Sequence, residues 1–268
     1  MRETGYAKIN LALHVRERMA DGYHRIETVF AFAEDGDELS VVGGDRLALE
    51  VTGPFAADLP AGEENLVLVA ARALAERSGC EEGGVLRLGK RLPVAAGIGG
   101  GSADAAAALR LLDRWWSLDL GEAALLELAR TLGADVPACL LSRPMRGEGR
   151  GDLLSRLAGE SLAGTPVLLV NPRVQMPTRA VFSAWDGIDR GPLGAWRDGR
   201  NDLEVPAVRL VPEVAEVLRS LAQATFARMS GSGATCFGLF ESEADRDATA
   251  AAIGAAHPQW WTLATRLR

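Results

Sequence analysis

A run of small residues between Leu92 and Asp104 is the part of the chain best suited to binding and chemistry. Four of the five residues from Gly97 to Gly101 are glycine, which costs backbone entropy and supplies no side chain to pack. The alanine-rich stretch that follows predicts a helix over residues 103–116, with Ser102 as its N-cap. Bare backbone N–H groups at the positive end of a helix bind anions, and a phosphate chain is the obvious guest.

The glycine run matches neither of the two common phosphate-binding motifs. It lacks the Lys-Ser/Thr ending of a P-loop, and it does not read G-x-G-x-x-G as a dinucleotide fold would. A nucleotide bound here would therefore lie on a different fold. A purely structural alternative stays open, in which the glycines let a turn pack the helix closely against a strand.

Lys8 lies in a stretch whose side chains alternate in character. Apolar residues occupy one face of residues 6–15, whereas Lys8, Asn10 and His14 occupy the other. This pattern predicts a half-buried strand with a polar second face. A lysine held there can stabilise a phosphoryl group or lower the pKa of a neighbouring acid. A solvated lysine at a sheet edge is the alternative.

Asp135 lies in Gly133-Ala134-Asp135-Val136-Pro137, directly after a helix predicted over residues 121–132. A carboxylate there can accept the proton of a substrate hydroxyl, which is the role of the base in kinases. An Asp two residues before a proline is also a natural N-cap. The residues alone leave both interpretations open.

Aromatic residues form a third candidate group. Tyr23 and His24 follow a turn at residues 21–22, where they can stack on and hydrogen-bond a planar base. Phe182 can be a second stacking wall. Ordinary packing in a hairpin and in a helix explains the same residues equally well. The small-residue loop 230–235 can bring backbone donors to a phosphate, or it can be a tight hairpin turn.

The remaining segments predict an α+β fold. Further strands are expected at residues 26–32, 38–42, 47–51, 85–88, 167–170, 226–229, 236–240 and 260–264, and further helices at residues 64–77, 177–185, 212–222 and 242–253. Residues 141–164 are rich in Gly, Arg and Ser, and residues 186–204 read as irregular. We therefore expect two domains, residues 1–150 and 151–268, with antiparallel pairs rather than a doubly wound parallel sheet.

Composition and charge limit the class of protein. A chain of 268 residues with a net charge of −7 can hold one large or two small domains, and it is not expected to bind nucleic acid. Its three cysteines lack C-x-x-C spacing, which fits a reducing compartment better than a disulfide framework or a zinc site. No apolar leader or membrane-length apolar run is present. We expect a cytoplasmic protein without a membrane partner.

Six pieces of the sequence, taken together, resemble the GHMP kinases. They occur in that family's order and span almost the whole chain: Ala7-Lys8-Ile9-Asn10-Leu11, Ala20-Asp21-Gly22-Tyr23-His24, Pro93 to Asp104, Gly133-Ala134-Asp135-Val136-Pro137, Asn201-Asp202-Leu203-Glu204, and Met229 to Cys236. The second and fifth pieces discriminate best, because other GHMP kinases lack them. They place the resemblance in the branch that acts on a cytidyl-diphosphate-linked polyol in non-mevalonate isoprenoid precursor biosynthesis.

The resemblance implies an ATP-dependent kinase that uses Mg²⁺ and phosphorylates the 2-hydroxyl of that polyol. Lys8 and Asp135 would be the catalytic pair, with Asp135 taking the proton from the hydroxyl. The family fold would give an N-terminal domain like domain 2 of ribosomal protein S5, which binds ATP and carries the catalytic residues. The C-terminal domain would be ferredoxin-like and would bind substrate.

The resemblance also implies the binding residues. Asn10 would lie beside the reacting hydroxyl, and Tyr23, His24 and Phe182 would hold the cytosine ring. The residues implied for ATP are Pro93, Ala95, Ala96, Gly97, Ile98, Gly99, Gly100, Gly101 and Ser102. No carboxylate cluster in the sequence identifies the Mg²⁺ ligands, and no oligomeric partner can be read from it.

The chain departs from the family pattern at two points. The family usually has Met-Gly-Ala-Gly or a similar run where this chain has Val94 to Gly97, and a second serine is common at Ala103. Both changes concern nucleotide affinity rather than reaction class. Two other functions stay open: a GHMP kinase for another alcohol, which would not need Tyr23 and His24, and a non-catalytic nucleotide-binding relative.

Overall fold

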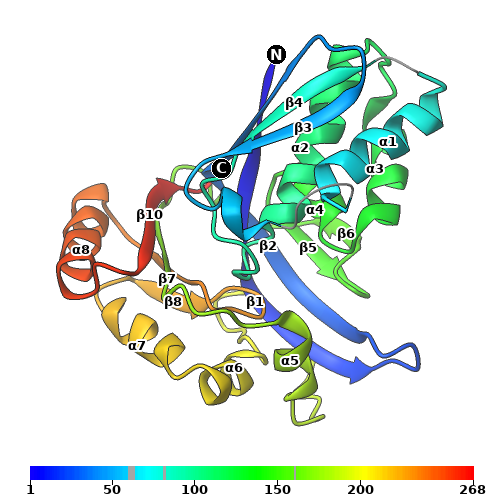
Figure 1. Ribbon diagram of the computed structural model, residues 1–268. Helices are drawn as coiled ribbons and strands as arrows, with labels where there is room; N and C mark the ends of the chain where they lie inside the picture. Colours follow the sequence, from blue (N-terminus) through cyan, green and yellow to red (C-terminus); the bar gives the residue numbers. More distant parts are fainter. Residues whose placement is uncertain (60–63, 81–82, 160) are drawn as a thin grey trace. The chain divides into compact units, whose positions relative to one another are not determined.

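The computed structural model describes residues 1–59, 64–80, 83–159 and 161–268 (Figure 1). Two compact units are present. The first comprises Met1–Ala7, Asp35–Val94 and Gly99–Ser142, and the second comprises Lys8–Glu34, Ala95–Ile98 and Arg143–Arg268. Two long strands, β1 (Arg2–Arg18) and β2 (His24–Val42), contribute residues to both units. The division into domains at residues 150 and 151 stays a prediction.

The first unit combines strands with a layer of helices. Its other elements are β3 (Leu47–Thr52), the short 3₁₀ helix η1 (Ala56–Asp58), α1 (Leu66–Ser78), β4 (Gly84–Gly89), α2 (Gly100–Trp115), α3 (Gly121–Leu132) and α4 (Val136–Leu141). Helix α2 contacts α1, α3 and α4. Its alanines are buried, and their small side chains let the neighbouring helices approach closely.

Strand β2 is longer than the sequence pattern suggests. Separate strands at residues 26–32 and 38–42 were the wrong prediction, because the chain stays extended between them. Two features explain the continuity. A Cβ on Gly36 would lie 2.0 Å from the carbonyl oxygen of Gly5, so only glycine permits this close approach of β1. The Asp37 side chain, between the two predicted strands, is fully buried and hydrogen-bonded.

The order of strands also differs from the order along the chain. Strand β4 lies between β2 and β3, pairing antiparallel with the former and parallel with the latter. Residues 43–45 therefore connect two strands that are not neighbours. Strand β1 was predicted to be half-buried, and this was wrong as well. Both faces are covered from Ala7 to Val15, so Lys8, Asn10 and His14 are buried polar residues.

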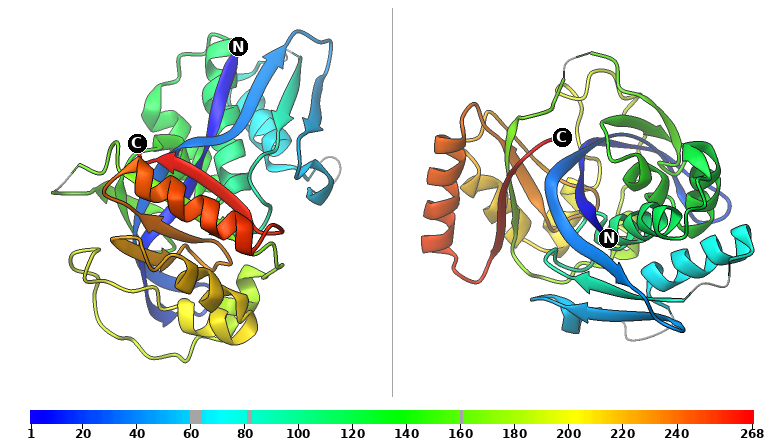
Figure 2. Two further views of the ribbon diagram at one scale, coloured as in Figure 1. Left: turned by 90° about the vertical axis from the view of Figure 1, so that its left-hand side faces the viewer. Right: turned by 90° about the horizontal axis from the view of Figure 1, so that it is seen from above.

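The second unit contains the ferredoxin-like arrangement that was predicted. Its elements are β5 (Met145–Glu148), β6 (Leu153–Arg156), β7 (Pro166–Asn171), α5 (Thr178–Ser183), α6 (Glu204–Leu210), α7 (Glu213–Ser220), β8 (Phe226–Met229), β9 (Cys236–Leu239), α8 (Glu243–Ala256) and β10 (Trp261–Arg266). From β7 onward they follow a β-α-β-β-α-β pattern in the sheet order β10-β7-β9-β8. Helix α8 packs along β7 and β10 (Figure 2).

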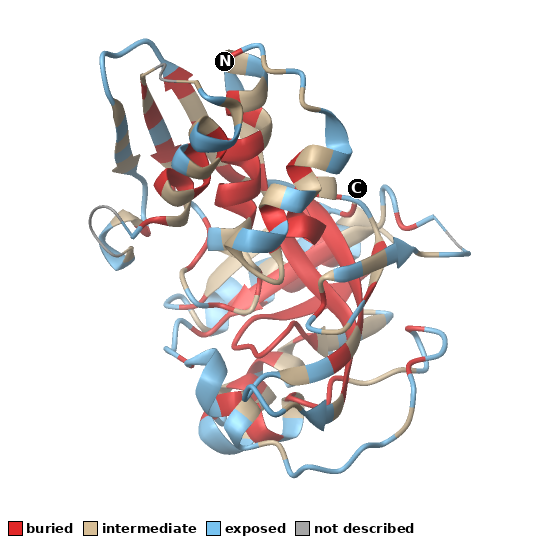
Figure 3. Ribbon diagram, turned by 90° about the vertical axis from the view of Figure 1, so that its right-hand side faces the viewer, coloured by how far each residue is buried: buried red, intermediate tan, exposed pale blue. Residues whose placement is uncertain are grey.

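The core of the second unit lies between this sheet and its helices. Leu168 and Val170 of β7 pack in one apolar cluster with Val214 and Val217 of α7 and Ile253 of α8. These buried positions are red in Figure 3. Together with the first unit, this sheet and its helices confirm the α+β class.

The sequence analysis missed the strands β5 and β6 and the helix α6. Strands β5 and β6 lie in the segment rich in Gly, Arg and Ser, and they are held by pairing with each other and with β2. Helix α6 contains Pro206, a residue type that is unfavourable in a helix interior. The proline is its third residue, where a backbone N–H has no partner within the helix, so the proline costs little.

Candidate active site

The Lys8 side chain is held in place rather than solvated. It is 3% exposed, and its ammonium donates a hydrogen bond to Asn10 Oδ1 at 2.8 Å. The same ammonium lies 5.4 Å from the centre of the Phe30 ring. These contacts are inconsistent with a solvated lysine at a sheet edge. A buried lysine with a fixed partner is suited to stabilise a negatively charged group.

The middle of the glycine-rich loop is fastened to the second unit through its backbone. Ile98 O accepts a hydrogen bond from Lys8 N at 3.0 Å, and Gly97 O accepts one from Ser230 Oγ at 2.9 Å. Gly97 has a φ of +77°, and a Cβ there would lie 2.5 Å from the carbonyl oxygen of Ser230. Close packing against the loop 230–235 therefore requires glycine at this position.

Ala95 adopts a φ of +53°, in the left-handed region that favours glycine. The family pattern that the sequence resembles usually has glycine at this position. An alanine in this conformation costs roughly 1 kcal/mol. The departure noted in the sequence thus has a local energetic consequence in the loop.

The end of the glycine-rich loop forms the start of helix α2 in the first unit. The helix begins at Gly100, after Gly99 with a φ of +63°, so the prediction of Ser102 as N-cap was wrong. Glycine can adopt the left-handed conformation that starts the helix three residues early. No side chain caps the terminus, and its first turn contains no acidic residue. The N–H groups of Gly100, Gly101 and Ser102 therefore remain suited to an anion.

A buried triad of charges joins the two flanks of the loop within the first unit. Lys90 Nζ donates to Asp37 Oδ2 at 2.5 Å and to Asp104 Oδ2 at 2.7 Å. Asp37 Oδ1 accepts from the backbone N–H groups of Arg91 and Leu92. Lys90 precedes the loop and Asp104 follows it in α2. The sequence analysis missed this triad, because its members are far apart in sequence and share no local pattern.

Charge balance explains how the triad ionises. Burial alone disfavours the ammonium, but the two carboxylates outweigh it and raise the pKa of Lys90. Burial raises the pKa of Asp104 to about 7, with Asp37 acting in the same direction and Lys90 opposing it. Asp104 Oδ1 has no hydrogen-bond partner among the described residues. When Asp104 is protonated, the triad contains one ammonium and one carboxylate, so its net charge is zero.

The structure brings two of the three predicted cytosine-binding residues together. The rings of His24 and Phe182 lie 5.0 Å apart at 36°, and Trp185 meets His24 edge-on at 5.7 Å. Tyr23 is 56% exposed, and the centre of its ring lies 4.1 Å from the guanidinium carbon of Arg150. Trp185, which lies just beyond the end of α5, was missed.

The His24 imidazole is suited to contact a neutral base. Burial lowers the pKa of His24, and the nearby Arg18 charge lowers it further. The ring is therefore neutral at physiological pH, so it has one donor and one acceptor nitrogen.

Asp135 lies at the start of α4 in the first unit. Its side chain makes no capping hydrogen bond to that helix, which contradicts the capping alternative. Its pairing with Lys8 stays a prediction.

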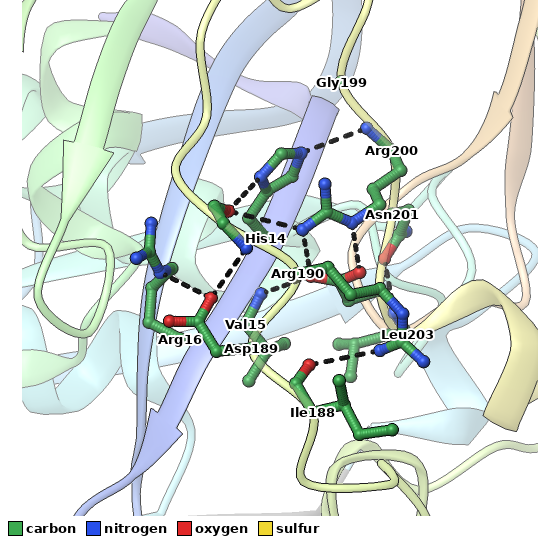
Figure 4. A network of polar contacts seen from close by, with 12 residues as sticks. His14, Val15, Arg16, Ile188, Asp189, Arg190, Gly199, Arg200, Asn201 and Leu203 are labelled. Atoms are coloured by element: carbon green, nitrogen blue, oxygen red, sulfur yellow. Dashed lines mark hydrogen bonds and ion pairs between the residues drawn. The ribbon is translucent and has the colours of Figure 1, made fainter.

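His14 connects β1 to the irregular segment before α6 (Figure 4). Arg200 N donates to His14 Nε2 at 3.2 Å, so the proton of the neutral ring lies on Nδ1 and is donated to Gly191 O at 3.1 Å. Asp202 Oδ2 accepts from Val15 N at 2.8 Å, and Arg200 Nε donates to Asp202 Oδ1 at 2.6 Å. Burial lowers the pKa of His14, and Arg200 acts in the same direction.

The Asn201-Asp202-Leu203-Glu204 motif has a bracing role in this structure. Asn201 Nδ2 donates to the carbonyl oxygens of Met229 and Gly231, both at 2.8 Å. The motif therefore secures the small-residue loop 230–235 through its backbone. This contact was not foreseen, since the motif was identified only by resemblance.

No group of three or more His, Cys, Asp or Glu side chains among the described residues could hold a metal ion. None of the helices described is both long enough and apolar enough to span a membrane.

Comparisons with known proteins agree along the whole chain. Residues 65–143 match the family model for the GHMP kinases N terminal domain, and residues 187–259 match the model for the GHMP kinases C terminal domain. The 4-diphosphocytidyl-2-C-methyl-D-erythritol kinase of Rhizorhabdus wittichii is 56% identical, over 99% of this chain and 94% of the relative. That of Sphingopyxis alaskensis is 50% identical, over 100% and 99%.

Solved structures give the same result. A crystal structure of 4-(cytidine 5'-diphospho)-2C-methyl-D-erythritol kinase has a TM-score of 0.85 at 36% identity and covers 100% of this chain and 99% of that chain. The homoserine kinase from Cytophaga hutchinsonii has a TM-score of 0.68 at 16% identity, covering 97% and 95%. The second likeness shows a shared fold alone.

Proposed function

The chain belongs to the GHMP kinase family, and we propose that it transfers the γ-phosphoryl group of ATP to the 2-hydroxyl of 4-diphosphocytidyl-2-C-methyl-D-erythritol. The observation that carries this proposal is the 56% identity to a kinase of that name over 99% of the chain. The products are ADP and the 2-phosphate of the polyol, an intermediate of the non-mevalonate route to isoprenoid precursors. The buried Lys8, the uncapped start of α2 and the aromatic pair support it.

ATP binds through the glycine-rich loop in this proposal. The N–H groups at the start of α2 contact the phosphates, and no side chain or acidic residue of that turn competes with them. When bound with ATP, Mg²⁺ would supply positive charge to the phosphates. Because the described residues contain no cluster of ligating side chains, phosphate oxygens and water would supply most of its ligands.

The transfer itself needs a base and a positive charge. Asp135 accepts the proton of the 2-hydroxyl, whose oxygen forms the new bond to the γ-phosphorus while the bond to the bridging β–γ oxygen breaks. The electron pair of that bond leaves with ADP. Lys8 offsets the charge that develops on the transferred group, and Asn10 holds both the ammonium and the acceptor hydroxyl.

The cytidyl group gives the acceptor its specificity. His24 and Phe182 hold the cytosine ring by stacking, and the neutral imidazole hydrogen-bonds the base. Tyr23 contributes from the hairpin at residues 21–24. A homoserine or mevalonate-like acceptor has no planar base to occupy these side chains, which favours the cytidylated polyol over another alcohol.

Product analysis tests the proposal. The purified protein with ATP, Mg²⁺ and the cytidylated polyol should form one ADP per molecule of polyol, with the new phosphate on the 2-hydroxyl by ³¹P NMR. Asp135→Asn should abolish product formation, whereas the exposed Asp58→Asn should leave it unchanged. Phosphate on a different hydroxyl, or no ADP from a folded protein that binds ATP, would refute the proposed reaction.

A further inference from the structure

We propose that Thr28 is a positioning residue that sets the orientation of the Asn10 amide and, through it, the position of the Lys8 ammonium. The inference rests on the proposed function only in giving Lys8 a catalytic role. All residues involved belong to the second unit.

A continuous series of hydrogen bonds connects the three side chains. Thr28 Oγ1 donates to the carbonyl oxygen of Ala12 at 2.6 Å, and Asn10 Nδ2 donates to Thr28 Oγ1 at 2.8 Å. Asn10 Oδ1 accepts from Lys8 Nζ at 2.8 Å. Thr28 is 0% exposed, so no solvent water competes for its hydroxyl. The series begins at a backbone carbonyl and ends at the ammonium.

The direction of each bond follows from the number of protons available. A threonine hydroxyl has one proton, and a carbonyl oxygen such as that of Ala12 can only accept. Once Thr28 donates to Ala12, it can only accept from Asn10. The amide must therefore turn its NH₂ group to Thr28 and its oxygen to Lys8. A flipped amide would set its NH₂ group against the ammonium, with two donors facing each other.

A second hydroxyl, that of Ser230, fixes the backbone of Asn10 in the same way. Asn10 N donates to Ser230 Oγ at 3.1 Å, and that hydroxyl gives its own proton to Gly97 O at 2.9 Å. Ser230 is also fully buried. Asn10 is thus held between two hydroxyls, each committed to a backbone carbonyl. Of these two hydroxyls, only that of Thr28 contacts the side-chain amide, and it holds the amide oxygen toward the Lys8 ammonium.

The test replaces the hydroxyl while keeping the shape. Thr28→Val should lower kcat about tenfold or more, as expected for one buried hydrogen bond plus a displaced ammonium, with the KM for ATP unchanged. Thr28→Ser restores the hydroxyl and should recover most of kcat. The matched control is Thr249→Val on α8, which also removes a hydroxyl bonded to a backbone carbonyl, that of Asp245, and should leave kcat unchanged.

A double-mutant cycle separates positioning from general structural damage. If Thr28 acts through Asn10, Thr28→Val should have no further effect in an Asn10→Ala background. A full additional loss in that background, wild-type kcat in a folded Thr28→Val, or no rescue by Thr28→Ser would overturn the inference.

If Thr28→Val does not fold, hydrogen exchange in the wild-type protein tests the inference without an activity assay. In the wild-type protein, the Asn10 side-chain NH₂ group should show slow hydrogen exchange by NMR, since both Asn10 and its acceptor Thr28 are buried. Fast exchange would overturn the inference. A wild-type protein that shows slow exchange but no kinase activity would instead refute the proposed function and leave the Thr28 relay standing.

Discussion

Asp104 in the buried triad should make the stability of this protein depend on pH in an unusual direction. Burial raises the pKa of Asp104 to about 7, against the opposing attraction of Lys90. A carboxyl group whose pKa is higher in the folded than in the unfolded state binds its proton more tightly when folded. Its contribution to stability is therefore complete below the unfolded pKa of 3.8 and is lost as the pH rises through about 7.

The size of the effect follows from the shift. Asp104 shifts by about three pKa units, and each unit corresponds to about 1.4 kcal/mol, which gives a ceiling of about 4 kcal/mol. Asp104→Asn keeps the shape and cannot titrate. Relative to this variant, the wild-type protein should lose up to about 4 kcal/mol of unfolding free energy between about pH 4 and pH 8.

Urea denaturation of both proteins across this pH range measures the difference directly. The titrating groups outside the triad are common to the two proteins, so their contributions cancel to first order. Asp113→Asn, on the same helix, serves as a control for loss of an acidic residue. A wild-type minus Asp104→Asn difference that stays constant, or that grows in favour of the wild type at high pH, would mean that the Lys90 ion pair outweighs burial.

Four further predictions concern the site and its loops. Asp135→Asn should lower kcat by roughly 10²- to 10⁴-fold with little change in KM for the acceptor; near-normal turnover would remove its role as base. Tyr23→Ala and Phe182→Leu should each raise the KM for the cytidylated acceptor about tenfold in steady-state assays; unchanged values would exclude the cytosine clamp. The lowered pKa of His14 favours the neutral ring in the folded state, so the protection factors for hydrogen exchange at residues 190–200, corrected for the intrinsic rates, should fall as the pH falls below about 6.5, and His14→Gln should abolish this dependence. Ala95→Gly should raise the unfolding free energy by about 0.5–1 kcal/mol in urea; a decrease would mean that chain entropy outweighs the strain.

Periodic and capping signals predicted much of the fold. Helix α3 was predicted with its observed bounds, and Ser242 caps α8 as expected, accepting a hydrogen bond from Asp245 N. Both depend on interactions within a few residues. The turn at residues 21–22 likewise contains its own signal, with Gly22 N bonded to Met19 O.

The failures share a different cause, which is stabilisation by residues distant in sequence. Strand β5 exists because it pairs with β2, more than a hundred residues earlier along the chain. The polar face of β1 is buried because the side chains of Asn10 and His14 find partners at Thr28 and Gly191. No local pattern announces such partners.

The candidate site likewise contains some features that the sequence predicted and others that it could not predict. The glycine-rich loop and Lys8 could be selected from residue types alone, because a phosphate needs backbone donors and positive charge. The Lys90 triad and the hydrogen bonds that connect Thr28 to Lys8 could not be predicted, because their function depends on which atoms face each other. Family resemblance supplied the role of Asp135, which stays a prediction.

The most direct test of the central claim is turnover with two acceptors. ADP release should be measured in a coupled assay with ATP, Mg²⁺ and either 4-diphosphocytidyl-2-C-methyl-D-erythritol or the same polyol lacking the cytidyl group. We expect turnover with the cytidylated compound and none with the polyol that lacks the cytidyl group. Equal turnover with both would contradict the His24 and Phe182 clamp, and turnover with neither would contradict the proposed kinase reaction.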